Sequence, residues 1–143
     1  MNAKYSNIIL VIIVIIIGAY AIYLSGMHGY YEVLLGNNNP NGVFFDAITG
    51  NLLSKQFSGW PGWPAFSIIP NFLITGLLVF TIDGLFLIWL VFFHNNQRWG
   101  AVIILFSILL CIFGGGFKPP FFGIVSGVIS KIGNKIIINK SKS

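Results

Sequence analysis

Charged residues are scarce in this chain of 143 residues, and acidic ones are nearly missing. Lysine, arginine, aspartate and glutamate make up 8% of the residues, with three acids among them, whereas 56% of the residues are hydrophobic. Soluble domains carry about 25% charged residues. The mean hydropathy of +0.87 also indicates a chain that is much more apolar than a soluble domain. We therefore expect an integral membrane protein located in the cell membrane.

The chain also has few of the side chains from which catalytic and metal sites are built. One cysteine, Cys111, allows no internal disulfide, and the two histidines and three acids are thinly scattered. His28 and Glu32 lie four residues apart, but two ligands of mixed type fall far short of a metal site. We interpret them as an interfacial histidine and a solvated glutamate. We predict a non-enzymatic protein with no catalytic residues, metal or cofactor.

The net charge of +5 does not indicate nucleic-acid binding. The basic residues are not clustered with aromatic side chains on a polar face. Four lysines lie in the tail after Ser130: Lys131, Lys135, Lys140 and Lys142. Such a juxtamembrane cluster faces the cytoplasm and anionic lipid. We expect the lipid bilayer as a partner and no nucleic acid.

Three apolar segments predict membrane-spanning helices over 8–24, 70–93 and 99–116. At 1.5 Å per residue, the first would reach about 26 Å and the second about 36 Å. The first could instead be a cleaved signal peptide, because Lys4 precedes it and the tripeptide 19–21 suits cleavage. Its apolar residues continue past that tripeptide, which favours a retained anchor. The polar connection over 94–98 is short, so the third helix should return beside the second.

Glycines and prolines interrupt the chain after the third segment. The predicted helix break contains Gly114, Gly115, Gly116, Pro119 and Pro120. A helical piece over 120–132 follows, and Lys131 and Lys135 make it a poor independent span. The predicted fold is therefore a single all-α multi-pass domain with three transmembrane helices and a short or re-entrant fourth helix at the C-terminus.

The segment over 25–65 is expected to form an extramembrane or interfacial connection. Asparagine, glycine and proline predict a surface turn over 36–42. A weak amphipathic pattern over 43–57 indicates a helix along the interface, and two Trp-Pro pairs over 60–64 suit an interfacial collar.

Basic residues favour a cytoplasmic C-terminus. With the N-terminus inside and four crossings, the cytoplasmic side holds six basic residues and the outer side two. With the N-terminus outside and three crossings, the counts are again six and two. The counts therefore do not decide on which side the N-terminus lies, although a short N-terminal segment with one lysine favours the cytoplasmic side.

Asp83 lies at the centre of the second apolar segment. An ionised carboxylate there costs at least ~2.5 kcal/mol on insertion scales unless it is protonated, paired or facing a cavity. In one interpretation, Asp83 stays protonated and bonds Ser107 or Thr81 in a structural role. In the other, it is a proton or cation site.

Small residues recur at helical spacing and predict close helix packing. The second helix carries Gly76 and Gly84, the third carries Ser107, Cys111 and Gly115, and the C-terminal piece carries Gly123 and Gly127. We expect the first two stripes to pack against each other and the last to offer an oligomer face. The predicted role is a structural or accessory component that forms a homo-oligomer or joins a larger membrane partner. The alternative is an oligomeric transporter or ion channel using Asp83.

Overall fold

The computed structural model describes residues 3–38, 44–45 and 65–140, with side chains over 8–38 and 67–133. This part of the chain is a bundle of four helices. They are α1 (Ala3–Leu35), α2 (Phe72–Phe92), α3 (Trp99–Ile112) and α4 (Lys118–Lys140). The strands β1 (Phe44–Phe45) and β2 (Ala65–Phe66) form one short antiparallel pair. The predicted all-α architecture is confirmed.

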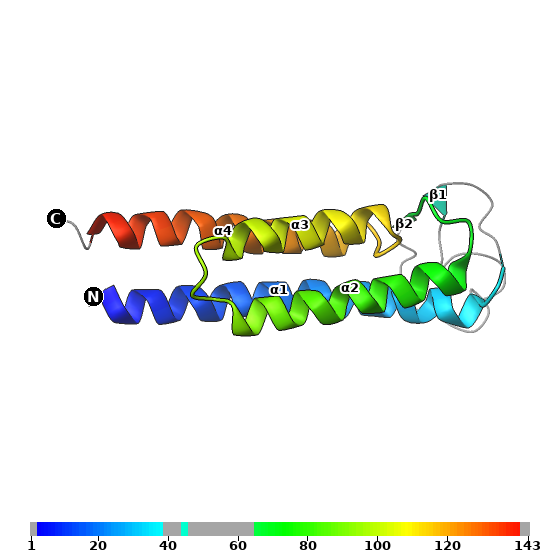
Figure 1. Cartoon of the computed structure of the whole chain (residues 1–143), viewed down its shortest axis with the longest axis horizontal. Coiled ribbons are helices and arrows are strands. Elements are labelled where there is room, and N and C mark those ends of the chain that lie inside the picture. The colour runs from blue at the N-terminus through cyan, green and yellow to red at the C-terminus, as the bar shows by residue number, and fades with distance from the viewer. Residues whose placement is uncertain (1–2, 39–43, 46–64, 141–143) are drawn as a thin grey trace.

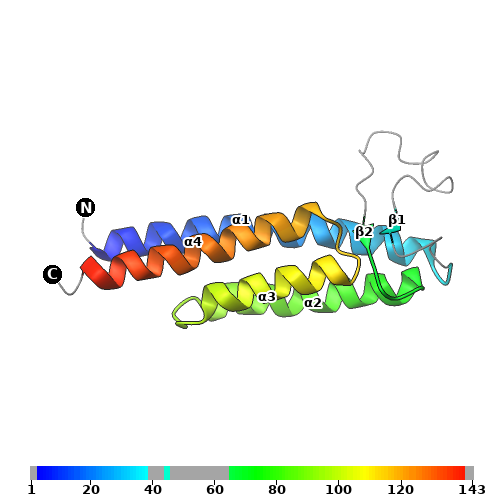
Figure 2. The same ribbon diagram turned by 90° about the horizontal axis from the view of Figure 1, so that it is seen from above.

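The helices form two antiparallel pairs packed side by side. In Figures 1 and 2, α4 runs back along α1, and α2 and α3 form a hairpin beside them. Both termini lie toward the same end of the bundle as the α2–α3 turn, and we call this the terminal end. The opposite end, where β1 and β2 and the α3–α4 turn lie, is called the loop end.

The first helix is much longer than predicted. It continues through Leu35, so the prediction that a connection begins at residue 25 is wrong. Its second half packs closely on α2 through glycine: a Cβ on Gly29 would lie 3.2 Å from Val79 Cβ and 3.3 Å from Gly76 O. The helix ends at Gly36, whose φ of 63° is a left-handed conformation that favours glycine.

Local signals explain where α2 and α3 begin and end. The Asn71 side chain caps α2 by accepting from Ile74 N at 3.0 Å, so this helix starts two residues after the predicted start. The chain breaks after the third helix at its glycines, where Gly114 has φ 98° and Gly116 has φ 77°, whereas Pro119 and Pro120 lie in the first turn of α4 and not in the break. Proline is well tolerated in the first turn of the helix that follows.

The fourth helix is longer than expected. It has 23 residues, or about 34 Å, rather than the short piece over 120–132. Buried Ser126 and Ser130 and the glycines 123 and 127 give it an inward face of small residues, whereas Lys131 lies exposed. The helix therefore continues past Lys131, which lies on its exposed side.

The small-residue stripes pair differently from the prediction. Gly76 packs on Gly29 and Val33 of α1, and Gly84 has open space around it, so neither faces α3. Ser107 contacts Gly123 of α4 instead, while Cys111 is only partly buried and Gly115 packs against its own turn at Leu110. Gly127 lies against Gly100 O of α3. The predicted oligomer face is thus an internal helix contact.

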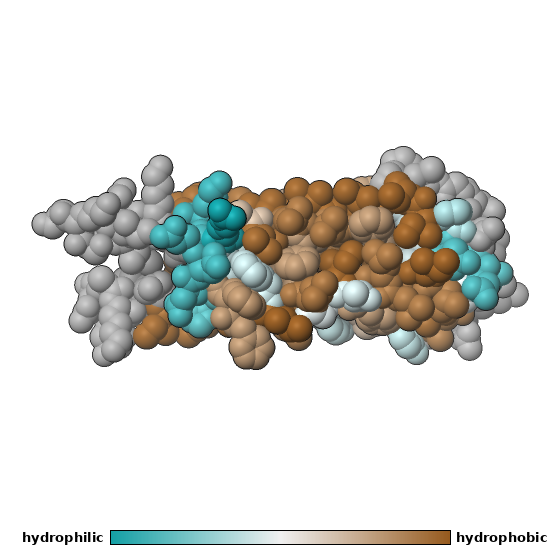
Figure 3. Space-filling view, in the orientation of Figure 1, coloured by the Kyte–Doolittle hydropathy of each residue, from teal (hydrophilic) through white to brown (hydrophobic). Residues whose placement is uncertain are grey.

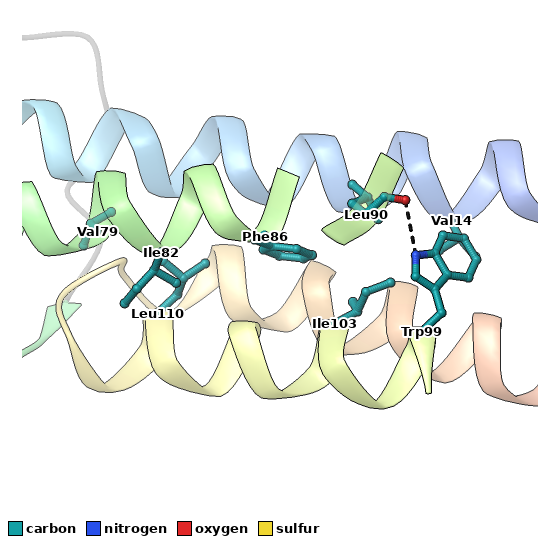
Figure 4. Packing of buried hydrophobic residues seen from close by; sticks show 8 residues of the cluster. All are labelled: Val14, Val79, Ile82, Phe86, Leu90, Trp99, Ile103 and Leu110. Atoms are coloured by element: carbon teal, nitrogen blue, oxygen red, sulfur yellow. Dashed lines mark hydrogen bonds between the residues drawn. The ribbon is translucent and has the colours of Figure 1, made fainter. Parts of the chain in front are cut away.

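An apolar core runs along the bundle, from Trp99 and Val14 toward the terminal end to Val79 and Leu110 in the loop-end half. Figure 4 shows the buried cluster, which contains Val14, Val79, Ile82, Phe86, Leu90, Trp99, Ile103 and Leu110. Trp99 Nε1 donates to Leu90 O at 3.2 Å, which satisfies a carbonyl in the last turn of α2.

The outer surface is apolar as well. Large side chains such as Ile16 and Phe121 are each 62% exposed. Figure 3 shows a broad hydrophobic band with hydrophilic residues gathered toward either end. Two segments, Ile8–Leu35 and Phe72–Phe92, are long and apolar enough to cross a membrane, while α3 is shorter. Their length and composition are compatible with membrane insertion.

Some predictions fall on residues outside the described ranges. These are the interfacial helix over 43–57 (except the two residues of β1), the tryptophan collar over 60–64 and most of the turn over 36–42. The side chains of the last three lysines also lie outside the ranges in which side chains are described.

Candidate functional site

Besides the phenol of Tyr31, three ionisable side chains are buried in the described part of the bundle. His28 is 1% exposed, Glu32 0% and Asp83 5%. On α1, Ser25, His28 and Glu32 follow one another at i, i+3 and i+7, which places them on one face. The interpretation of His28 and Glu32 as solvated interfacial residues is wrong, because α1 continues as a helix and turns this face inward.

Asp83 joins this face from the middle of α2. Ser25 Oγ donates to Asp83 Oδ1, while Oδ2 has no hydrogen-bond partner among the described residues. The predicted partners are wrong. Thr81 Oγ1 is exposed and donates to Leu77 O of its own helix, and Ser107 donates within α3. The carboxyl therefore connects α2 to α1 rather than to α3.

Glu32 lies two helical turns beyond Ser25, about 10 Å closer to the loop end. Neither of its carboxyl oxygens has a hydrogen-bond partner within the described ranges. The backbone of Gly114 lies against this carboxyl, since a Cβ there would be 2.7 Å from Glu32 Oε1 and would also contact Thr75. Thr75 Oγ1 donates to Asn71 O at 2.8 Å. Glu32 is thus enclosed by α2 and by the α3–α4 turn.

His28 lies between these two carboxyl groups along α1. Gly116 covers its ring, because a Cβ on Gly116 would lie 2.8 Å from His28 Nε2. The two left-handed glycines of the α3–α4 turn therefore fit directly over the imidazole and the Glu32 carboxyl. Side chains at these two positions would displace the groups beneath them.

These residues form a polar column that runs from the middle of the bundle toward the loop end. We define the polar column as Ser25, His28, Glu32, Thr75 and Asp83. The other buried polar residues toward the terminal end are serines, which carry hydroxyls that do not ionise at neutral pH. One of them, Ser126, donates to Val14 O at 2.9 Å. Among the described residues, buried ionisable groups are therefore confined to one half of the interior.

The column has the chemistry of proton exchange. Within the described ranges, no three histidine, cysteine, aspartate or glutamate residues are close enough to hold a metal ion together. The carboxyls, the imidazole and the hydroxyls can each accept or donate a proton. Cys111 lies half-buried on α3 and is not part of the column.

Comparison with known proteins gives no assignment for this site: the chain matches no protein-family model, no curated protein and no solved structure.

Proposed function

We propose that this chain is a multi-pass membrane protein that passes protons or cations through a site centred on Asp83. The supporting observation is the burial of Asp83, Glu32 and His28 in one half of a bundle whose largest buried cluster is apolar. Burying ionisable groups inside a membrane is costly, and such residues mark ion pathways and proton relays. The polar column would form the part of this pathway that leads to the loop end.

Four membrane crossings suit this bundle. Its termini lie toward the same end, as an even number of crossings requires, and an apolar surface faces outward. Arg98 lies in the α2–α3 turn at the terminal end, whereas Lys118 begins α4 at the loop end. Together with the lysines near the two termini, this distribution supports cytoplasmic placement of the terminal end.

The apolar half of the interior must open for ions to cross. Phe86, Leu90 and Trp99 close it in the described arrangement. A homo-oligomer, a larger membrane partner or a second packing of the same helices would supply the remaining path. This requirement is consistent with the small size of the chain, because one short chain has too few helices to surround a complete channel.

A structural or accessory role is the second candidate. It is favoured by the bond between Ser25 and Asp83, which ties α1 to α2 in mid-bundle. A helix-tying role explains one carboxyl oxygen but leaves the buried Glu32 without a purpose. The ion-passing role uses both carboxyls, and we therefore prefer it.

The test is ion flux into liposomes containing the full chain. Asp83→Asn keeps the shape of the side chain and still accepts from Ser25, but it cannot titrate. We expect this variant to lower the flux by roughly 100-fold, as loss of a positioned proton-transfer group does. The matched control is Ser130→Ala, which removes a buried polar group outside the column and should keep the wild-type rate. Equal flux from wild type and Asp83→Asn would favour the accessory role.

A further inference from the structure

We infer that the ion taken by the polar column is the proton and that Glu32 is its outer carboxyl, relaying protons through His28 to Asp83. This inference depends on the proposed function and specifies both its ion and its route.

The spacing of the two carboxyls opposes direct binding of a metal cation. A calcium ion takes six to eight oxygen ligands at about 2.3–2.6 Å. Glu32 and Asp83 lie on levels about 10 Å apart, separated by two turns of α1. This separation disfavours a single ion held by both carboxyls. The column instead offers one titratable group at about each helical turn, a spacing that suits stepwise transfer.

Glu32 supplies an independent observation. Its side chain is 0% exposed, and both carboxyl oxygens lack a hydrogen-bond partner in the described part of the chain. An ionised carboxylate held in this way would strongly destabilise the bundle. Bound protons remove that charge, and no other cation is needed. Asp83 Oδ2 is in the same situation at the inner end of the column.

The proposed steps conserve protons, and their net result is one proton moved from the loop end to the Asp83 carboxylate. The Glu32 carboxylate takes a proton from the loop end and becomes a neutral acid. It passes this proton to the neutral imidazole of His28, which becomes an imidazolium while Glu32 returns to the carboxylate. The imidazolium gives one proton to the Ser25 hydroxyl as that hydroxyl gives its own to Asp83. His28 is then neutral again, and Asp83 is a neutral acid.

Among the described residues, few other titratable groups surround the column. On α1 and α2, the buried titratable residues are His28, Glu32 and Asp83, which belong to the column, and Tyr31, which packs against Met27 and Leu35. The α3–α4 turn faces it with the backbone of its glycines. Of the nearby titratable residues on α3 and α4 in the described ranges, Cys111 is half-buried and Lys118 is exposed.

The test follows the Asp83 carboxyl band by infrared spectroscopy after a rapid pH jump, with the full chain in lipid bilayers. Asp83→Asn identifies the band. We expect Glu32→Gln to slow the protonation of Asp83 by roughly 100-fold. Glu32→Asp, which retains a carboxyl, should recover much of the rate and shows that slowing does not reflect misfolding. Ser130→Ala serves as the matched control outside the column.

Each outcome decides a different part of the inference. Unchanged kinetics in Glu32→Gln would overturn the relay while leaving the proposed function standing. A shift of the Asp83 band on adding sodium or potassium at constant pH would overturn the proton as the ion, again without removing the function. An Asp83 band that never responds to pH or to cations would overturn both proposals.

Discussion

Replacing Gly127 by alanine should push α3 and α4 apart. A Cβ at this position would lie 2.6 Å from Gly100 O and 2.6 Å from Ile104 Cγ1, with Ile104 N at 3.2 Å. Two of these three neighbours are backbone atoms, which cannot rotate away. The contact is also tight from the other side, because a Cβ on Gly100 would lie 2.5 Å from Gly127 O. The helices themselves must therefore move.

The expected loss of stability follows from two opposing terms. Inserting a methyl group into a close-packed interior costs about 1–3 kcal/mol, and backbone neighbours place this site near the upper limit. Alanine regains about 1 kcal/mol over glycine in a helix interior. We expect a net destabilisation of about 2 kcal/mol, roughly a 30-fold change in the folding equilibrium at 1.36 kcal/mol per tenfold.

Gly84→Ala is the matched control for this measurement. It makes the same substitution inside α2, but no atom lies within 4 Å of the added Cβ. It should gain up to about 1 kcal/mol from helix propensity alone. Both free energies of unfolding can be measured by reversible denaturation in mixed micelles, followed by circular dichroism. Equal stabilities of the two variants would refute the close approach of α3 and α4.

Three further substitutions test the contacts around the polar column and the core. Ser25→Ala removes the donor to Asp83 Oδ1 and should lower the free energy of unfolding by about 1–3 kcal/mol in the same denaturation assay; no loss would deny that bond. Trp99→Phe removes the bond to Leu90 O and should cost about 1 kcal/mol or more, and unchanged stability would contradict it. Gly116 has a φ of 77° and lies close to His28, so Gly116→Ala should lower the free energy of unfolding by about 1–3 kcal/mol. Unchanged stability would contradict this turn geometry.

Strong local signals in the sequence were sufficient for much of the fold. The apolar runs identified the helix pair α2 and α3, and the glycines and prolines located the α3–α4 turn. The length of α1 was missed because polar residues after residue 24 resemble a membrane boundary when the chain is read alone. Burial against α2 overrides that local signal, and no single segment reveals it. The length of α4 was missed for the same reason, since its small inward residues depend on α3 and α1.

The candidate site was predicted only in part. Asp83 was identified because a carboxylate in an apolar run is conspicuous. Its partner Ser25 was not, because a tertiary contact over 58 residues leaves no local trace. The spacing of Ser25, His28 and Glu32 on one helical face was the available signal. It acquires meaning only once α1 is known to continue past residue 24.

The most direct test of the central claim is an equilibrium pH titration of the Asp83 carboxyl in lipid bilayers. Infrared difference spectra of the full chain, with Asp83→Asn as the blank, isolate its band. If the polar column exchanges protons with water, the band should change between about pH 5 and 9, the range around neutral pH in which a proton-transfer group must titrate to work. A carboxyl that stays protonated throughout this range would mean a dry structural hydrogen bond to Ser25 and would contradict the account.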